Sequence, residues 1–145
     1  MRTVIQRVTA GSVSVNDALV SEIGLGVVVL VGVGTSDTGA EADWLADKIA
    51  HLRIFDDGAG KMNLSLIDVG GAALVVSQFT LYGSAEKGLR PSFTGAAPPE
   101  HAEPLVARFI ARLASHGVTV RTGIFRADMR VSIVNDGPVT IVLER

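Results

Sequence analysis

The segment Leu25–Val33 constrains the fold of this chain more than any other. Its residues are almost continuously aliphatic and β-branched, with Gly24 and Gly26 near its start and Gly32 and Gly34 at its end. A strand with only one buried face would alternate apolar and polar residues, whereas this composition is typical of a strand buried on both faces. The segment is therefore predicted to be a central strand.

Two helices are predicted to accompany this strand. Between Gly39 and Arg53 the apolar residues recur at helical spacing, after a Ser-Asp-Thr run of which any member can cap the first turn. The second helix opens at Pro98-Pro99-Glu100 and is expected to end at Gly117. The apolar faces comprise Leu45, Ile49 and Leu52 in the first helix, and Leu105, Phe109, Ile110 and Leu113 in the second.

The other apolar segments are predicted to be strands. An N-terminal hairpin or bent meander is expected from Thr3–Val8 and Ser12–Val15, which alternate with period two around a tight reversal at Gly11. Ala72–Phe79 is the next buried strand. Three closing strands are expected at Val118–Thr122, Met129–Val134 and Val139–Leu143.

The predicted fold class is α/β: one domain over residues 1–145, with a mostly β body, two helices packed on it and α/β/β layers. A chain of 145 residues can bury a core of its own. The absence of cysteine excludes disulfides and thiolate sites, and is consistent with a reducing compartment. No signal peptide and no membrane span is recognisable, so a cytoplasmic, membrane-free protein is expected.

The net charge of −2 argues against a protein that holds long nucleic acid through its overall field. Local cationic groups remain. Arg121, Arg126 and Arg130 lie close together in sequence, and Lys87 and Arg90 flank a glycine in a polar segment. Such groups are either solvated or able to bind phosphate, and charge pattern alone leaves both interpretations open.

The Gly137-Pro138 step separates two segments that otherwise resemble strands. Proline cannot donate a hydrogen bond to a sheet and glycine weakens a strand, so a shaped corner is expected between Val131–Val134 and Val139–Leu143. From the residues alone the Gly-Pro bond would be trans, because only about 5% of such bonds in folded proteins are cis.

Several familiar sites can be considered. Gly32-Val33-Gly34 resembles the start of a dinucleotide loop, but the third glycine of that motif would fall at Asp37. The three histidines have no zinc-site spacing and no metal is expected. Ser77 and Thr80 are candidate nucleophiles that lack a base nearby in sequence; as an alternative, their hydroxyls cap the end of a strand.

Six short runs of the chain form a recognisable set: Ile5-Gln6-Arg7-Val8, Gly60-Lys61-Met62-Asn63-Leu64, Ser77-Gln78-Phe79-Thr80-Leu81, Arg90-Pro91-Ser92-Phe93, Ala127-Asp128-Met129 and Asn135-Asp136-Gly137-Pro138-Val139-Thr140. Together they resemble D-aminoacyl-tRNA deacylases over essentially the whole chain. The resemblance implies a cytoplasmic homodimer with a β-rich interface. Its implied activity is hydrolysis of the ester that joins a D-amino acid, or glycine, to the terminal adenosine of tRNA, without a cofactor and without DNA as a partner.

The resemblance also implies roles for particular residues. Ser77, Gln78, Phe79 and Thr80 are expected to form the catalytic pocket. Met129 and Phe125 would close its wall, although core packing is an alternative for both. Gly137-Pro138, joined by a cis bond, would enter the pocket of the other protomer and exclude L-amino acids sterically.

Further roles concern support and tRNA binding. Arg7 would brace the Gly-Pro corner by bonding to its carbonyls, and the alternative is an exposed strand arginine. Lys87, Arg90, Ser92 and Phe93 would receive the terminal adenosine or nearby phosphates. The chain departs from the commoner family pattern at Leu89, Ile124 and Arg126, to which the resemblance assigns no role.

Two reaction schemes are compatible with these residues. In one, the Thr80 hydroxyl attacks the ester. In the favoured one, water attacks with help from the vicinal ribose hydroxyl while backbone N–H groups near Phe79 and Thr80 stabilise the oxyanion. Two rival functions remain: an esterase or peptidase with Ser77 in a triad, and a dimeric binding module without catalysis.

Overall fold

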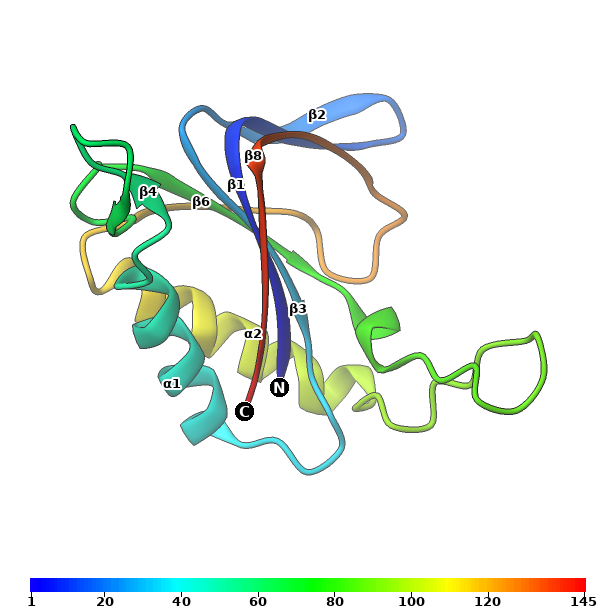
Figure 1. Cartoon of the computed structure of the whole chain (residues 1–145). Coiled ribbons are helices and arrows are strands. Elements are labelled where there is room, and N and C mark those ends of the chain that lie inside the picture. Colours follow the sequence, from blue (N-terminus) through cyan, green and yellow to red (C-terminus); the bar gives the residue numbers. More distant parts are fainter.

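The computed structural model describes the whole chain, residues 1–145, and places the Leu25–Val33 segment inside a six-stranded sheet (Figure 1). Here β3 (Gly26–Gly32) lies between β1 (Arg2–Val15), which is antiparallel to it, and β6 (Ala72–Ser77), which is parallel. The sheet continues through β2 (Ala18–Ile23) at one end and β7 (Thr119–Thr122) at the other, while β8 (Arg130–Glu144) pairs with β1. The predicted central strand is confirmed.

Both helices cover one face of this sheet (Figure 1). Helix α1 spans Gly39–Ala50 and α2 spans Pro99–Ala114. Thr38 caps α1, because its side chain accepts from the Ala40 amide and its own amide donates to the Glu41 carboxylate. The main core lies between the helices and the sheet and includes Val27, Val29, Val31, Leu45, Ile49, Phe109 and Leu113.

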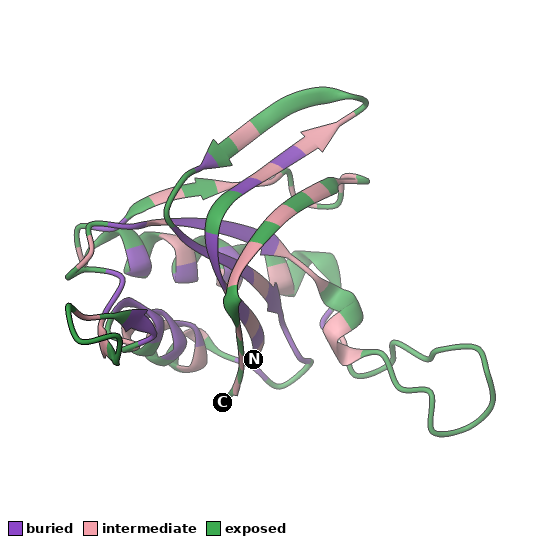
Figure 2. Cartoon of the chain, turned by 45° about the horizontal axis from the view of Figure 1, so that its top comes forward, coloured by how far each residue is buried: buried purple, intermediate pink, exposed green.

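A second, smaller core lies on the opposite face of the sheet. It contains Val8, Val13, Ile23, Val28, Leu74 and Val76, with Met129, Val131 and Ile133 packed against it. Consecutive residues of β3 therefore enter different cores and are nearly all buried (Figure 2), which explains why this strand has no polar residue. The single-domain α/β fold with α/β/β layers is confirmed.

The predicted reversal at Gly11 is wrong, because β1 runs without a break from Arg2 to Val15. Gly11 is buried and pairs with Ile23 on one side and Ile133 on the other. A Cβ at this position would lie 2.7 Å from the Val28 side chain. The glycine is thus required for close packing rather than for a turn, and the chain reverses at Asn16-Asp17 instead, where both residues have positive φ.

The division of the C-terminal segment into two strands is also wrong in part. Both halves pair with the same strand, β1, so they form the single strand β8. Their register shifts on either side of Val8: Gln6 pairs with Thr140, whereas Val8 pairs with Asn135. The Gly137-Pro138 corner is therefore an enlarged bulge within one long strand.

Smaller differences concern element ends and short elements. The apolar pattern of Ala72–Phe79 ends as a strand at Ser77, after which a 3-10 helix, η1, spans Phe79–Tyr82. Sequence patterns did not reveal β2 or the small hairpin of β4 (Phe55–Asp56) and β5 (Met62–Leu64). None of the helices combines the length and apolar character needed to span a bilayer.

Candidate functional site

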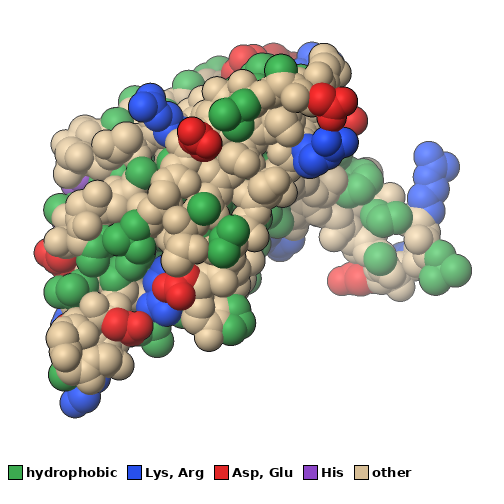
Figure 3. Space-filling model, turned by 90° about the horizontal axis from the view of Figure 1, so that it is seen from above, with side chains coloured by type: hydrophobic (Ala, Val, Ile, Leu, Met, Phe, Trp, Pro, Cys, Tyr) green, Lys and Arg blue, Asp and Glu red, His purple; other side chains and the backbone are tan.

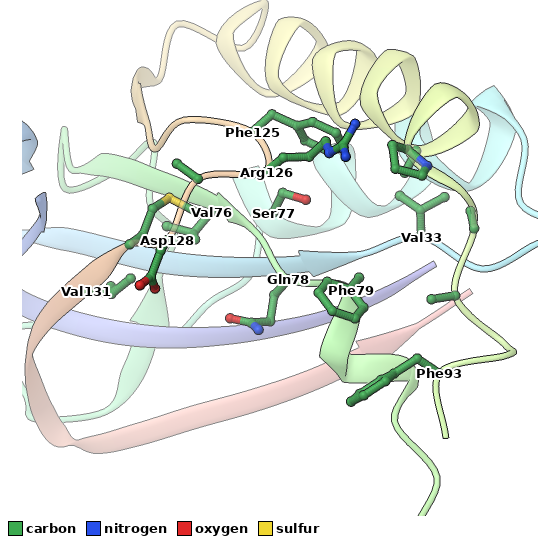
Figure 4. A pocket seen from close by; sticks show the side chains of 16 residues that line it. Val33, Val76, Ser77, Gln78, Phe79, Phe93, Phe125, Arg126, Asp128 and Val131 are labelled. Atoms are coloured by element: carbon green, nitrogen blue, oxygen red, sulfur yellow. The ribbon is translucent and has the colours of Figure 1, made fainter. Parts of the chain in front are cut away.

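A cavity of about 570 Å³ opens where β6 ends. Its floor is the end of β6, one wall is the loop between β7 and β8, and the other is the segment that leads into α2 (Figure 4). Most of its lining is apolar. Pockets beyond the carboxyl ends of parallel strands are common ligand sites in α/β folds, because strand ends release polar groups there.

The cavity brings together six residues that the sequence analysis singled out from three separate segments. Ser77 ends β6 and is followed by Gln78 and Phe79. Phe93 comes from the loop after η1, and Phe125 and Met129 come from the β7–β8 loop. Met129 also packs against the second core, so it lines the cavity and supports the fold at once.

The remaining predicted residues lie outside the cavity lining. Thr80 is exposed on η1, and its hydroxyl accepts a short hydrogen bond from the Gln78 amide. Lys87, Arg90 and Ser92 belong to the loop between η1 and α2. Gly137 and Pro138 are exposed at the β8 corner and do not line the cavity of their own chain.

Two glycines allow η1 to pack against the end of β3. A Cβ on Gly32 would lie 3.0 Å from the Gln78 carbonyl oxygen, and one on Gly34 would lie 2.8 Å from the Tyr82 hydroxyl. These are the glycines that resemble a dinucleotide loop, and here they accommodate protein. The Tyr82 hydroxyl donates to Asp37, and burial together with this carboxylate raises the pKa of Tyr82 to about 12.

The loop after η1 projects away from the body of the molecule. Ser84 and Ser92 exchange two backbone hydrogen bonds of 2.8 Å and close its base. Phe93 then meets Phe79 edge to face, with ring centroids 5.2 Å apart. In Figure 3 the loop stands apart from the body and displays cationic, acidic and hydrophobic side chains. The aromatic contact links the loop to the mouth of the cavity.

Arg7 supports the β8 corner from the interior of the protein. The residue is only 6% exposed, so the exposed-arginine alternative is wrong. The guanidinium donates to the Asp136 carbonyl at 3.3 Å and lies 3.0 Å from the Asp136 carboxylate. It also donates to the Ile54 carbonyl at 2.8 Å. The contact is thus with the residue before the Gly-Pro step rather than with the Gly-Pro carbonyls.

The corner itself has a defined shape. The Gly137–Pro138 peptide bond is cis and Gly137 has a φ of 112°. A Cβ on Gly137 would lie 2.9 Å from the Arg7 guanidinium, and a φ of this sign is strained for any residue with a side chain, so glycine is favoured here. The Asn135 amide donates to the carbonyls of Arg7 and Val139, at 2.9 and 3.0 Å, and ties both sides of the corner together.

No histidine lies in the cavity lining. His51 and His116 meet edge to face beside Asp47 on the helical layer, and His101 contacts the Asp37 carbonyl. A triad built on Ser77 is therefore not formed, which removes the geometric basis for the esterase or peptidase alternative. No group of three or more side chains is arranged to hold a metal ion.

A family model described as D-Tyr-tRNA(Tyr) deacylase matches residues 4–144. The chain belongs to this family. The resemblance seen in the six motifs is thereby confirmed.

Individual relatives of this deacylase-family chain cover nearly all of it. Proteins called D-aminoacyl-tRNA deacylase are 61% identical over 144 residues in Thermomicrobium roseum (99% of this chain, 94% of the relative) and 58% identical over 145 residues in Pelobacter propionicus (all of both chains). A solved structure described as c-Myc DNA Unwinding Element Binding Protein superimposes with a TM-score of 0.93 at 42% identity, covering 100% of this chain and 99% of that one.

A probable eukaryotic D-amino acid tRNA deacylase superimposes with a TM-score of 0.86 and covers 98% of this chain and 97% of that one. At 20% identity this similarity shows a shared fold.

Several lining residues of this deacylase-family chain were not assigned to the pocket from sequence. They are Val33, Val76, Ala96, Ala97, Pro99, Ala102, Arg126, Ala127, Asp128 and Val131. Ala97 donates to the Val33 carbonyl, which brings the start of α2 beside the end of β3. The available signal was topological: parallel strands such as β3 and β6 end at the same edge of a sheet, so segments that follow them meet there.

Proposed function

We propose that this chain hydrolyses the ester bond that joins a D-amino acid to the 3′-terminal adenosine of tRNA. The observation that carries the proposal is the cavity at the end of β6, lined by Ser77, Gln78 and Phe79, in a chain that belongs to the deacylase family. A mostly apolar cavity with a few polar groups suits an adenosine together with an amino acid side chain.

Chiral selection is proposed to come from the partner of a homodimer. Gly137 and Pro138 are exposed and lie outside the cavity of their own chain. The buried Arg7 contacts the corner from inside the molecule, so the corner faces outward and is held in place by the fold. Inserted into a partner's cavity, its backbone would face the α-carbon of the substrate. Hydrogen fits against such a wall and a side chain does not, so L-amino acids are rejected while D-amino acids and glycine are admitted.

Chiral selection by a partner's Gly-Pro corner requires a homodimer, and the outer surface of β8 supports such an assembly. Val142 is 67% exposed and Val134 is 57% exposed on this strand. Val142 pairs with Val4 of β1, so apolar residues of adjacent strands lie side by side there. Exposed valines on a sheet surface beside the corner are a suitable contact for a second copy of the chain.

The proposed reaction uses water. Its oxygen attacks the ester carbonyl carbon, the bond from that carbon to the ribose oxygen breaks, and the water proton passes to the ribose oxygen with help from the vicinal hydroxyl. The N–H groups of Phe79 and Thr80 have no acceptor inside η1, because they begin the helix, and are proposed to stabilise the oxyanion. Thr80 bonds to Gln78 and has no base beside it, which disfavours attack by its hydroxyl.

Binding of the tRNA end is proposed for the projecting loop. Lys87 and Arg90 supply charge, while Ser92 and Phe93 lie at its base next to the cavity. Cations contribute affinity for any tRNA backbone, whereas the Phe93 ring provides a surface for a base.

Deacylation of matched D-, L- and glycyl-tRNA by the purified protein tests the proposal. We expect rapid hydrolysis of D-tyrosyl-tRNA and measurable hydrolysis of glycyl-tRNA, with L-tyrosyl-tRNA left intact. Equal hydrolysis of D- and L-tyrosyl-tRNA would contradict the proposed chiral selection. Binding of tRNA without release of any amino acid would instead support the non-catalytic module.

A further inference from the structure

The cavity contains a cation to which neither the sequence motifs nor the proposed mechanism gives a role. Arg126 lines the cavity and forms no hydrogen bond or ion pair with any other residue. In Figure 4 its guanidinium lies beside Phe125 on the side of Ser77. A guanidinium is always charged and carries five donors, so an unpaired one in a ligand cavity has its full binding capacity available.

The backbone at Arg126 is unusual for this residue type. It has a φ of 64°, in the left-handed region, within a turn that the Ala127 amide closes onto the Ile124 carbonyl at 3.2 Å. Glycine or asparagine adopts this conformation at lower cost, and strained non-glycine residues concentrate at functional sites. The turn thus holds an arginine where its side chain is directed along the cavity wall.

Asp128 does not neutralise this charge. It is the other charged residue of the cavity lining and forms no ion pair with Arg126. Figure 4 shows its carboxylate at the opposite end of the cavity, near Val131. The end of the cavity beside Phe125 is therefore positively charged, although the whole chain carries a net charge of −2.

We propose that Arg126 binds the phosphate that links the terminal adenosine to the rest of the tRNA, and so is a substrate-binding residue of this site. The inference rests on the proposed function. A phosphate is present in every aminoacyl-tRNA, and a guanidinium binds it through two parallel hydrogen bonds. The neighbouring rings of Phe125 and Phe79 provide surfaces for the adenine that adjoins this phosphate.

The test compares substrates with and without this phosphate. Arg126→Gln is expected to raise KM for D-tyrosyl-tRNA about tenfold, the usual loss for one charge-assisted contact, and to change kcat less than twofold. For D-tyrosyl-adenosine, which lacks the phosphate, the variant should match the wild type. Arg121→Gln, which removes an exposed cation outside the cavity, is the matched control and should leave both substrates unaffected.

Two results would overturn the proposal. Equal losses on D-tyrosyl-tRNA and D-tyrosyl-adenosine would mean that Arg126 acts on the pocket's shape. A loss of hydrolysis confined to D-aspartyl- and D-glutamyl-tRNA would mean that Arg126 binds the side-chain carboxylate of the amino acid.

A binding measurement separates this inference from the proposed function. Wild-type protein should bind AMP more tightly than adenosine, and Arg126→Gln should abolish the difference. If the protein prefers AMP but never deacylates D-aminoacyl-tRNA, the proposed function fails and the phosphate site stands. If deacylation occurs without any preference for AMP, the phosphate site fails and the function stands.

Discussion

Thr80 shows how a residue's contacts limit its chemistry. A hydroxyl becomes a nucleophile when a base accepts its proton, and here its hydroxyl contact is the Gln78 side-chain amide, which donates to it. The same threonine lies in the first turn of η1, where its backbone N–H is free of helical bonding. In the proposed mechanism the residue would therefore offer its backbone, rather than its side chain, to a reaction intermediate.

At this scale we predict that Thr80→Ala retains deacylation. The rate should fall less than about tenfold, because loss of one neutral hydrogen bond around Gln78 costs about 1 kcal/mol. Single-turnover hydrolysis of D-tyrosyl-tRNA measures the effect, with Thr80→Ser as the conservative control. A folded, tRNA-binding Thr80→Ala protein without activity would identify the hydroxyl as the nucleophile.

At the scale of elements, Gly26 of β3 pairs with Ala72 of β6, where the two strands begin to run side by side. A Cβ there would lie 1.8 Å from the Ala72 carbonyl oxygen, a contact with backbone that cannot be relieved by a side-chain movement. Because β3 and β6 supply residues to both cores, their separation affects the whole sheet.

Gly26→Ala is therefore predicted to destabilise the protein by about 3 kcal/mol or more, which is the range of severe packing defects. Urea unfolding followed by circular dichroism measures the change. Gly24→Ala is the matched control, since its Cβ would meet nothing within 4 Å, and its effect should stay within about 0.5 kcal/mol. Similar midpoints for the two variants would contradict the prediction.

Helices α1 and α2 are joined by ion pairs around Asp47. Arg112 forms two hydrogen bonds with this carboxylate, at 2.6 and 2.9 Å, and His116 approaches it at 2.6 Å. The hydrogen bond from Arg112, followed by that from His116, lowers the pKa of Asp47 from 3.8 to about 2. The folded state thus favours the ionised carboxylate.

The sign of this pKa change determines its pH dependence. Asp47 contributes stability above pH 4 and loses that contribution as the pH falls through about 2. The destabilisation caused by Asp47→Asn should therefore be largest above pH 4 and shrink toward pH 2, and its size should be modest because the carboxylate is partly exposed. Urea midpoints between pH 2.5 and pH 6 measure it, with Asp17→Asn as the exposed control. A pH-independent difference would contradict this account.

At the scale of the whole molecule, the outer surface of β8 and the β8 corner belong to the same strand. A partner that covers Val142 is therefore held in fixed relation to Gly137-Pro138 along a continuous backbone. In the proposed dimer, assembly and chiral selection thus depend on one element.

We predict that Val142→Asp yields a folded monomer with little deacylase activity. A buried unpaired carboxylate would oppose the proposed interface, whereas in a monomer the exposed side chain would be solvated. Light scattering after gel filtration measures the oligomeric state. Leu89→Asp is the control for that state, because it changes an exposed leucine of the loop that projects from the body of the molecule (Figure 1). An active Val142→Asp monomer would refute the partner-supplied filter.

The sequence by itself determined the central strand, both helices and the family. These features depend on local periodicity and on motifs: Leu25–Val33 has no polar residue because β3 borders two cores, and α1 and α2 carry apolar residues at helical spacing. In each case the spacing of apolar residues shows directly which face of the helix or strand is buried.

Tertiary structure alone decided how distant segments meet. Gly11 resembled a turn, yet it lies within β1 because Val28 packs against it, and the halves of β8 form one strand because both pair with β1. Likewise, the cavity joins the end of β6 to Arg126 across a large sequence separation. Local composition indicates whether a residue is buried or lies in a turn, but it does not indicate which distant residue it contacts. That contact depends on packing and strand pairing over the entire chain.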